Sequence, residues 1–201
     1  MTHDPAPGFH SYLVDTHVHF HPRFDELRFF RSAGQNFSTA AEALGVRGPW
    51  TGVLILTDTA ESHAFQTFLR RTSESGETGI SFEATKEDVS LRVCLREGRA
   101  GGPEPGTGRI PQLMMIAGAQ IQTAEDLEVL AFPTQSPPPD GLSLEETLSG
   151  VRAMGGVAIL PWGFGKWSFR RGTLIARFLD EREGDGAFLA DTGHRPRFAP
   201  Y

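Results

Sequence analysis

The alternation of apolar and polar residues predicts strands and helices in a largely βα order. The clearest signal is the apolar run GVLIL within residues 50–60, which is typical of a strand buried on both faces. Amphipathic stretches follow, and the first carries Phe24, Leu27 and Phe30 at helical spacing. The pattern predicts helices over 24–44, 61–75, 143–155 and 166–181, and strands over 50–60, 110–123, 125–132, 156–160 and 186–192.

Local signals refine this picture at two places. Residues 80–95 alternate apolar and polar positions on both sides of a charged turn, as an exposed antiparallel hairpin would. Ser143 and Glu146 are spaced as a capping box, and Gly155 is placed to end the same helix. We therefore expect a βα fold that a hairpin interrupts.

The segment LVDTHVHFHP, residues 13–22, carries the most specific chemistry in the chain. Its apolar start, from residue 12 to residue 14, predicts a strand buried on both faces, and Pro22 ends it. Successive strand side chains point to opposite faces, so alternate residues converge. Sites in parallel α/β sheets lie at the carboxyl ends of strands, which favours metal binding here. The residues expected to share this face are Asp15, His17, His19 and His21.

Composition narrows the class of protein. Hydrophobic residues at 39% and charged residues at 22% are ordinary for a globular protein, and we expect one domain over residues 1–201. A net charge of -6 argues against a nucleic-acid or anionic-membrane binder. The single cysteine, Cys94, excludes an intrachain disulfide and a cysteine zinc cage. With no secretory signal or membrane-spanning apolar run, a cytoplasmic protein is expected.

Five short motifs, taken in order, resemble the polymerase-and-histidinol-phosphatase (PHP) family of metal-dependent phosphoesterases, a relative of the amidohydrolase superfamily. The resemblance implies an α/β fold, a distorted (β/α)7 barrel of the TIM type, here with a hairpin insertion. It also implies a metal site built from histidines and carboxylates of all five segments. The motifs are DTHVHFHP, LILTDTAESH, IAGAQIQTAEDLEVLAF, GGVAILPWG and FLADTGHRP.

The chain departs from the family pattern at several ligand positions. Thr59 replaces a ligand histidine, Gln120 replaces a bridging glutamate, and Pro161 and Trp162 stand where another histidine is expected. A glutamine offers one neutral oxygen, so it cannot balance two adjacent dications. The resemblance therefore implies one divalent metal ion (zinc, manganese or iron) or none. The implied metal residues are His17, His19, Asp191 and Gln120, with Asp58 and His194 as catalytic base or orienting group.

The segment PWGFGKWSFRRG, residues 161–172, adds aromatic rings and cations after a predicted buried strand. Lys166 near a helix start, together with Arg170 and Arg171, is suited to an anion, and Trp162 to an apolar wall of the site. The alternative is that the tryptophans fill the core while the arginines are solvated. The sequence leaves both interpretations open.

Taken together, these features predict a metal-dependent hydrolase of the phosphoesterase type, which uses a metal-activated water on a small phosphorylated or anionic substrate. One alternative is a catalytically inactive PHP-like barrel that binds a ligand or a protein partner. A further alternative is an amidohydrolase-type C–N hydrolase or decarboxylase, which would normally need a lysine or more histidines on the middle strands. The sequence determines neither the substrate nor the oligomeric state.

Overall fold

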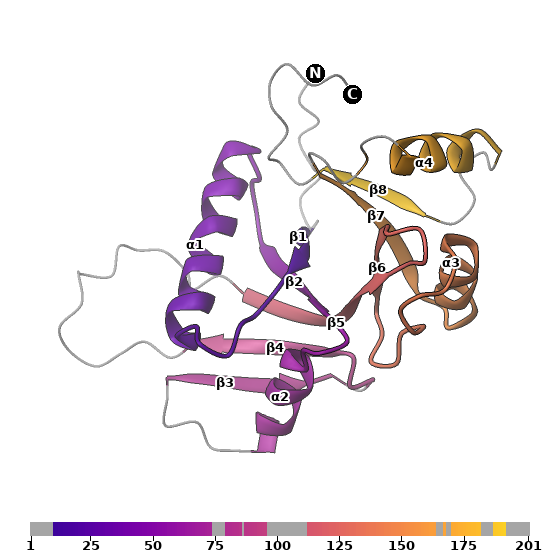
Figure 1. Ribbon diagram of the computed structural model, residues 1–201. Helices are drawn as coiled ribbons and strands as arrows, with labels where there is room; N and C mark the ends of the chain where they lie inside the picture. Colours follow the sequence, from indigo (N-terminus) through magenta and orange to yellow (C-terminus); the bar gives the residue numbers. More distant parts are fainter. Residues whose placement is uncertain are drawn as a thin grey trace. The chain divides into compact units, whose positions relative to one another are not determined.

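The computed structural model describes residues 10–73, 79–85, 87–95, 112–163, 167, 170–181 and 187–191, with the backbone alone at 73, 181 and 191. Strands and helices follow one another along the chain as Figure 1 labels them. They are β1 (Ser11–Val18), α1 (Glu26–Ala43), β2 (Trp50–Asp58), α2 (Ala64–Arg70), the 3-10 turn η1 (Arg71–Ser73), β3 (Ile80–Ala84), β4 (Ser90–Leu95), β5 (Gln112–Gln122), β6 (Glu128–Phe132), α3 (Leu144–Ala153), β7 (Val157–Trp162), α4 (Arg170–Glu181) and β8 (Phe188–Asp191).

The predicted (β/α)7 barrel is wrong. The strands form a mixed sheet in the order β1-β2-β5-β6-β7-β8, with β4 also on β5 and β3 on β4. The pairs β1/β2 and β7/β8 are parallel, whereas β3/β4, β4/β5, β5/β6 and β6/β7 are antiparallel. The hairpin over 80–95 is confirmed, but it belongs to the sheet through β4 and is not an insertion into a barrel.

The connection between β5 and β6 explains this difference. Parallel strands need a crossover of about a dozen residues, and only 123–127 separate these two. Thr123 closes the turn: its amide donates to the Leu127 carbonyl at 2.8 Å, and its hydroxyl accepts from the Leu127 amide at 3.2 Å. Asp126 adopts a positive φ of 60°. So short a loop reverses the chain.

The chain divides into two compact units. Unit 1 comprises residues 1–56 and 63–116, and unit 2 comprises residues 57–62 and 117–201. The expectation of one domain over 1–201 stays a prediction. In unit 2, α3 and α4 cover strands β5 to β7 with a continuous apolar core, which includes Ile121, Val129, Leu148, Leu160 and Ile175.

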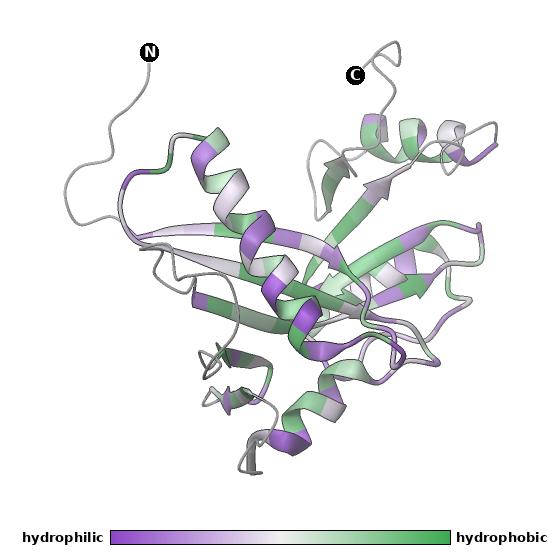
Figure 2. Ribbon diagram, turned by 90° about the vertical axis from the view of Figure 1, so that its left-hand side faces the viewer, coloured by the Kyte–Doolittle hydropathy of each residue, from purple (hydrophilic) through white to green (hydrophobic). Residues whose placement is uncertain are grey.

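In unit 1, α1 packs its apolar face on the sheet. Its buried residues are Phe30, Gly34, Phe37 and Ala41, and the helix runs through Gly34 without interruption. Colouring by hydropathy shows polar and apolar positions alternating along this helix (Figure 2). The helix begins later than predicted, because the Asp25 carboxylate caps it by accepting the Arg28 amide at 2.7 Å.

Strand β1 also differs from its prediction. It is the first strand in the order of the sheet and therefore lies at an edge. The side chains of Tyr12 and Val14 are 62% and 50% exposed, so the strand is not buried on both faces. Strand β2 matches its prediction, with seven consecutive buried residues. The apolar run alone does not separate an edge strand from a central one, since both favour the same residues.

Close packing of α1 against β2 makes Gly52 sensitive to substitution. A Cβ at this position would overlap the Phe37 ring and lie 2.9 Å from Leu113 Cδ2. We expect Gly52→Ala to lower the free energy of unfolding by about 1–3 kcal/mol through overpacking, as measured by urea denaturation. Ser32→Ala, on the exposed side of α1, is the control. An unchanged denaturation midpoint for Gly52→Ala would contradict the packing described.

The predicted capping box of α3 is confirmed. It leads us to expect that the free energy of unfolding depends on pH. Hydrogen bonds from the Ser143 hydroxyl and amide lower the pKa of Glu146 from its ordinary 4.5. A carboxyl group whose pKa is lower in the folded state than in the unfolded state stabilises the fold at pH values above its unfolded-state pKa. This stabilisation is lost as the pH falls through the folded-state pKa. We expect Glu146→Gln to be less stable than the parent near neutral pH, with the difference shrinking below pH 4.5. Urea denaturation over a pH series measures this, and a pH-independent difference would contradict it.

Candidate functional site

The end of β1 is irregular where the histidines begin. Asp15 pairs with Leu54 and Val18 with Leu56, so two residues of β1, Thr16 and His17, face the single residue between them on β2. This is the signature of a β-bulge, which redirects side chains and is common beside active sites. The strand ends at Val18, so His19 and His21 follow it rather than continuing its alternation.

Despite this irregularity, His17 and His19 converge. Their Nε2 atoms lie 3.0 Å apart, and their rings meet nearly edge to face with centroids 4.9 Å apart. The His17 ring is half-buried and the His19 ring is exposed. The Asp15 carboxylate accepts the His17 amide at 3.2 Å. Asp15 therefore holds the backbone of the bulge.

This pair fits a metal ion by its donor atoms and their spacing. Two imidazole nitrogens that bind one tetrahedral zinc at about 2.0–2.1 Å lie roughly 3.3 Å apart. The observed 3.0 Å requires only a small opening. The two Nε2 atoms are at hydrogen-bond distance from each other, and the tautomers of the rings decide which one donates. Among the described residues, no group of three histidine, cysteine, aspartate or glutamate side chains is arranged to hold a metal.

The other implied site residues belong to unit 2. Asp58 ends β2, and its Oδ1 accepts the Ser62 hydroxyl at 3.0 Å; the same hydroxyl oxygen accepts the Thr59 amide at 2.8 Å. Gln120 is half-buried in β5, opposite Leu130 of β6. Sequence reasoning missed Ser62, although its place four residues after Asp58 was visible. This serine orients the carboxylate.

The structure brings together two predicted residues at the carboxyl ends of β7 and β8. Trp162 pairs in register with Asp191, and these two strands are parallel. Nothing is described for the Asp191 side chain, and Lys166 and His194 lie outside the described residues. The metal role of Asp191 and the roles of Lys166 and His194 therefore stay predictions.

The predicted cations at the start of α4 differ in their surroundings. Arg170 is exposed, whereas Arg171 is half-buried and donates through Nη1 to the Asp126 carbonyl at 3.4 Å. Trp167 packs on the apolar core of unit 2. Arg171 thus has a structural contact in addition to its predicted role with an anion.

An aromatic cluster links the segment after the histidines to the core of unit 1. Phe20 makes edge contacts with Phe68, Phe29 and Phe24, with ring centroids 5.0, 5.1 and 6.0 Å away. Phe68 in turn meets the buried Phe30. Sequence reasoning missed this cluster, because its rings come from α1, α2 and the turn between β1 and α1. Its effect is to anchor that turn beside His19.

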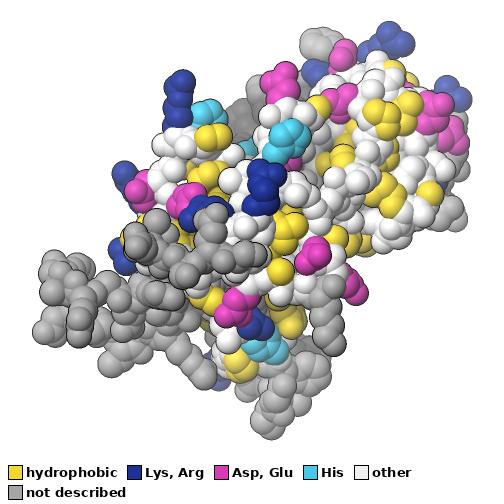
Figure 3. Space-filling view, turned by 90° about the horizontal axis from the view of Figure 1, so that it is seen from below, with side chains coloured by type: hydrophobic (Ala, Val, Ile, Leu, Met, Phe, Trp, Pro, Cys, Tyr) yellow, Lys and Arg dark blue, Asp and Glu magenta, His cyan; other side chains and the backbone are white. Residues whose placement is uncertain are grey.

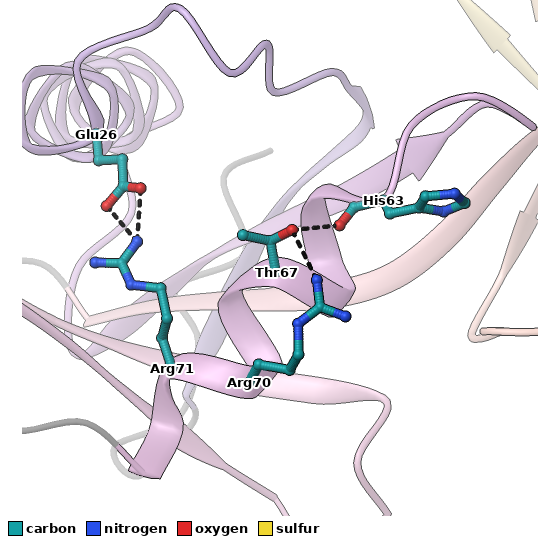
Figure 4. A network of polar contacts seen from close by, with 5 residues as sticks. All are labelled: Glu26, His63, Thr67, Arg70 and Arg71. Atoms are coloured by element: carbon teal, nitrogen blue, oxygen red, sulfur yellow. Dashed lines mark hydrogen bonds and ion pairs between the residues drawn. The ribbon is translucent and has the colours of Figure 1, made fainter.

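A partly buried ion pair anchors the start of α1 as well. Both Glu26 oxygens accept from Arg71 Nη1 at 2.6 Å (Figure 4). The Arg71 guanidinium also lies 5.3 Å from the centre of the Phe82 ring. Nearby, Arg70 donates to the Thr67 hydroxyl at 3.4 Å, and that hydroxyl donates to the His63 carbonyl at 2.9 Å (Figure 4). The ion pair ties α1 to the end of α2.

Charge and thiol chemistry add no second site in the described part of the chain. Acidic, basic, histidine and apolar side chains are interspersed on the face that Figure 3 shows.

Burial, followed by the nearby Glu83 carboxylate, raises the pKa of the Cys94 thiol, so the unreactive thiol form predominates near neutral pH. A structural role for Cys94 accords with this environment.

Comparisons with known proteins return no matching family, curated protein or solved structure. The resemblance to the PHP family therefore stays a prediction that rests on the five motifs. None of the helices in the described ranges is long and apolar enough to cross a membrane.

The ion pair between Glu26 and Arg71 should stabilise unit 1 measurably. Its side chains are 30% and 23% exposed, so solvent screens the pair only in part. We expect a double-mutant cycle with Glu26→Gln and Arg71→Met to give a coupling free energy of about 1 kcal/mol by urea denaturation.

The pair of Glu83 and Arg92 provides the matched control. These side chains are 57% and 63% exposed, and the same cycle there should give less than about 0.5 kcal/mol. Equal coupling energies in the two pairs would show that burial of Glu26 and Arg71 contributes nothing.

Proposed function

We propose that the chain is a metal-dependent hydrolase of the phosphoesterase type, with His17 and His19 holding one divalent metal ion. The observation that carries the proposal is the convergence of the two Nε2 atoms, 3.0 Å apart at the bulged end of β1. Paired imidazoles with this spacing are a common part of zinc, manganese and iron sites. The substrate is a small phosphorylated or otherwise anionic molecule.

Local structure prepares the two imidazoles for this role. The bulge places His17 and the residue before it opposite one residue of β2, and the Asp15 carboxylate holds the His17 amide at 3.2 Å. Phe20 packs into the aromatic cluster directly after His19. Both ligands are thus attached to ordered backbone, which reduces the entropy lost when they bind a cation.

His17 and His19 would hold the ion, and a divalent ion bound there would supply a water of lowered pKa as the nucleophile near neutral pH. In the hydrolysis, the water oxygen would bond to phosphorus as the bond between phosphorus and the ester oxygen breaks. A base would take the proton that the water loses and pass it to the leaving oxygen, which departs as an alcohol. Asp58 is the base that the motif implies, and Ser62 orients its carboxylate with a 3.0 Å hydrogen bond. Asp58 and Ser62 belong to unit 2, so their part in the reaction stays a prediction. The role of Asp191 as a third metal ligand also stays a prediction.

The proposal predicts metal content that depends on the histidine pair. Protein purified without an affinity metal should contain about one equivalent of a transition metal per chain. His17→Ala and His19→Ala should lose it, together with hydrolysis of phosphate monoesters, because one imidazole alone binds weakly. Elemental analysis and a phosphoester screen measure the two effects.

His10→Ala provides a matched control, since His10 is also exposed and its ring contacts Thr51 rather than the pair. It should keep its metal. Asp191→Asn should lose metal if Asp191 is the third ligand, and Asp58→Asn should keep metal but lose turnover if Asp58 is the base. A folded parent protein without metal, even after incubation with zinc, manganese or iron, would overturn the proposal and leave the binding-module alternative.

A further inference from the structure

The turn between β1 and α1 presents an aromatic ring to solvent in a fixed position. Phe24 is 52% exposed, although the sequence pattern predicts it on the apolar face of a helix. Its ring is stacked on Phe29, with an interplanar angle of 15° and centroids 6.4 Å apart, and meets Phe20 edge-on. Its amide donates to the His21 carbonyl at 2.9 Å. These contacts hold an exposed ring that could otherwise turn freely.

His21 forms a corner with this ring. The two ring centroids are 5.8 Å apart and the planes are inclined by 53°. His21 Nδ1 accepts the Arg23 amide at 3.2 Å, so in the neutral ring the proton resides on Nε2. The exposed His21 ring therefore carries a hydrogen-bond donor on the edge away from the backbone.

The corner lies close to the histidine pair along the chain. His21 follows His19 by two residues, which limits the separation of their Cα atoms to about 7 Å. Phe20, between them, is fixed by its contact with Phe68. A flat ring against Phe24 would place a substituent within reach of the His21 ring, whose centroid lies 5.8 Å from that of Phe24.

We propose that the His21 and Phe24 corner binds the aromatic ring of an aryl phosphate, with the His21 Nε2–H donating to a phosphate oxygen. Stacked and edge-to-face aromatic contacts are the attraction that Phe24 offers, and a neutral imidazole donor suits an anionic oxygen. This inference rests on the proposed function and specifies its substrate class. It concerns binding and adds no chemical step.

The experiment compares phenylphosphonate with methylphosphonate, neither of which can be hydrolysed, by isothermal titration calorimetry on the zinc-incubated protein. We expect the parent to bind phenylphosphonate about fivefold or more tightly, from one or two aromatic contacts. Phe24→Leu should remove most of this preference, which is the ratio of the two affinities measured on the same variant. Phe188→Leu is the matched control, since Phe188 is 67% exposed in β8, and it should keep the preference.

Equal affinity of the parent for the two phosphonates, or an undiminished preference in Phe24→Leu, would overturn the corner as a binding site. The proposed function fails separately, through metal content and turnover of the histidine variants. A preference for phenylphosphonate that disappears in Phe24→Leu supports the corner even if the parent holds no metal, and in that case only the hydrolytic role is lost.

Discussion

The parallel pairing of β1 with β2 is the constraint on which the candidate site depends. Strand β2 is buried over seven consecutive residues, and α1 packs on it so closely that Gly52 has no room for a side chain. Strand β1 is added at its edge, and the register changes where two residues of β1 face one of β2. Because the buried strand β2 cannot change its register, the extra residue is accommodated in β1, where the bulge includes His17.

Aromatic packing also fixes the segment that follows β1. Phe20 follows His19 directly and meets Phe68, which contacts the buried Phe30 of α1. The ion pair between Glu26 and Arg71 holds the first turn of α1 against the end of α2. The segment that carries His19, His21 and Phe24 is thus fixed from both ends. An exposed segment held in this way can present side chains in a defined geometry, which a ligand site requires.

The interpretation as a barrel was wrong because strand direction depends on connections more than on the strands themselves. Apolar runs predicted most strands, and the hairpin over 80–95 was recognised from its alternation. The five residues between β5 and β6, however, are too few for a crossover, and Thr123 closes them into a tight turn. Both strands were visible in the sequence, but their antiparallel direction followed from the length of this loop.

The sequence by itself determined the local features: the buried run of β2, the capping box at Ser143 and Glu146, and two histidines at alternate positions after an apolar strand. These depend on residues a few positions apart, whose geometry is set by the backbone period. Tertiary structure alone decided that β1 lies at the edge of the strand order and that a bulge falls at His17. These features arise from pairing and packing between segments far apart in the chain, and no short window of sequence contains both partners.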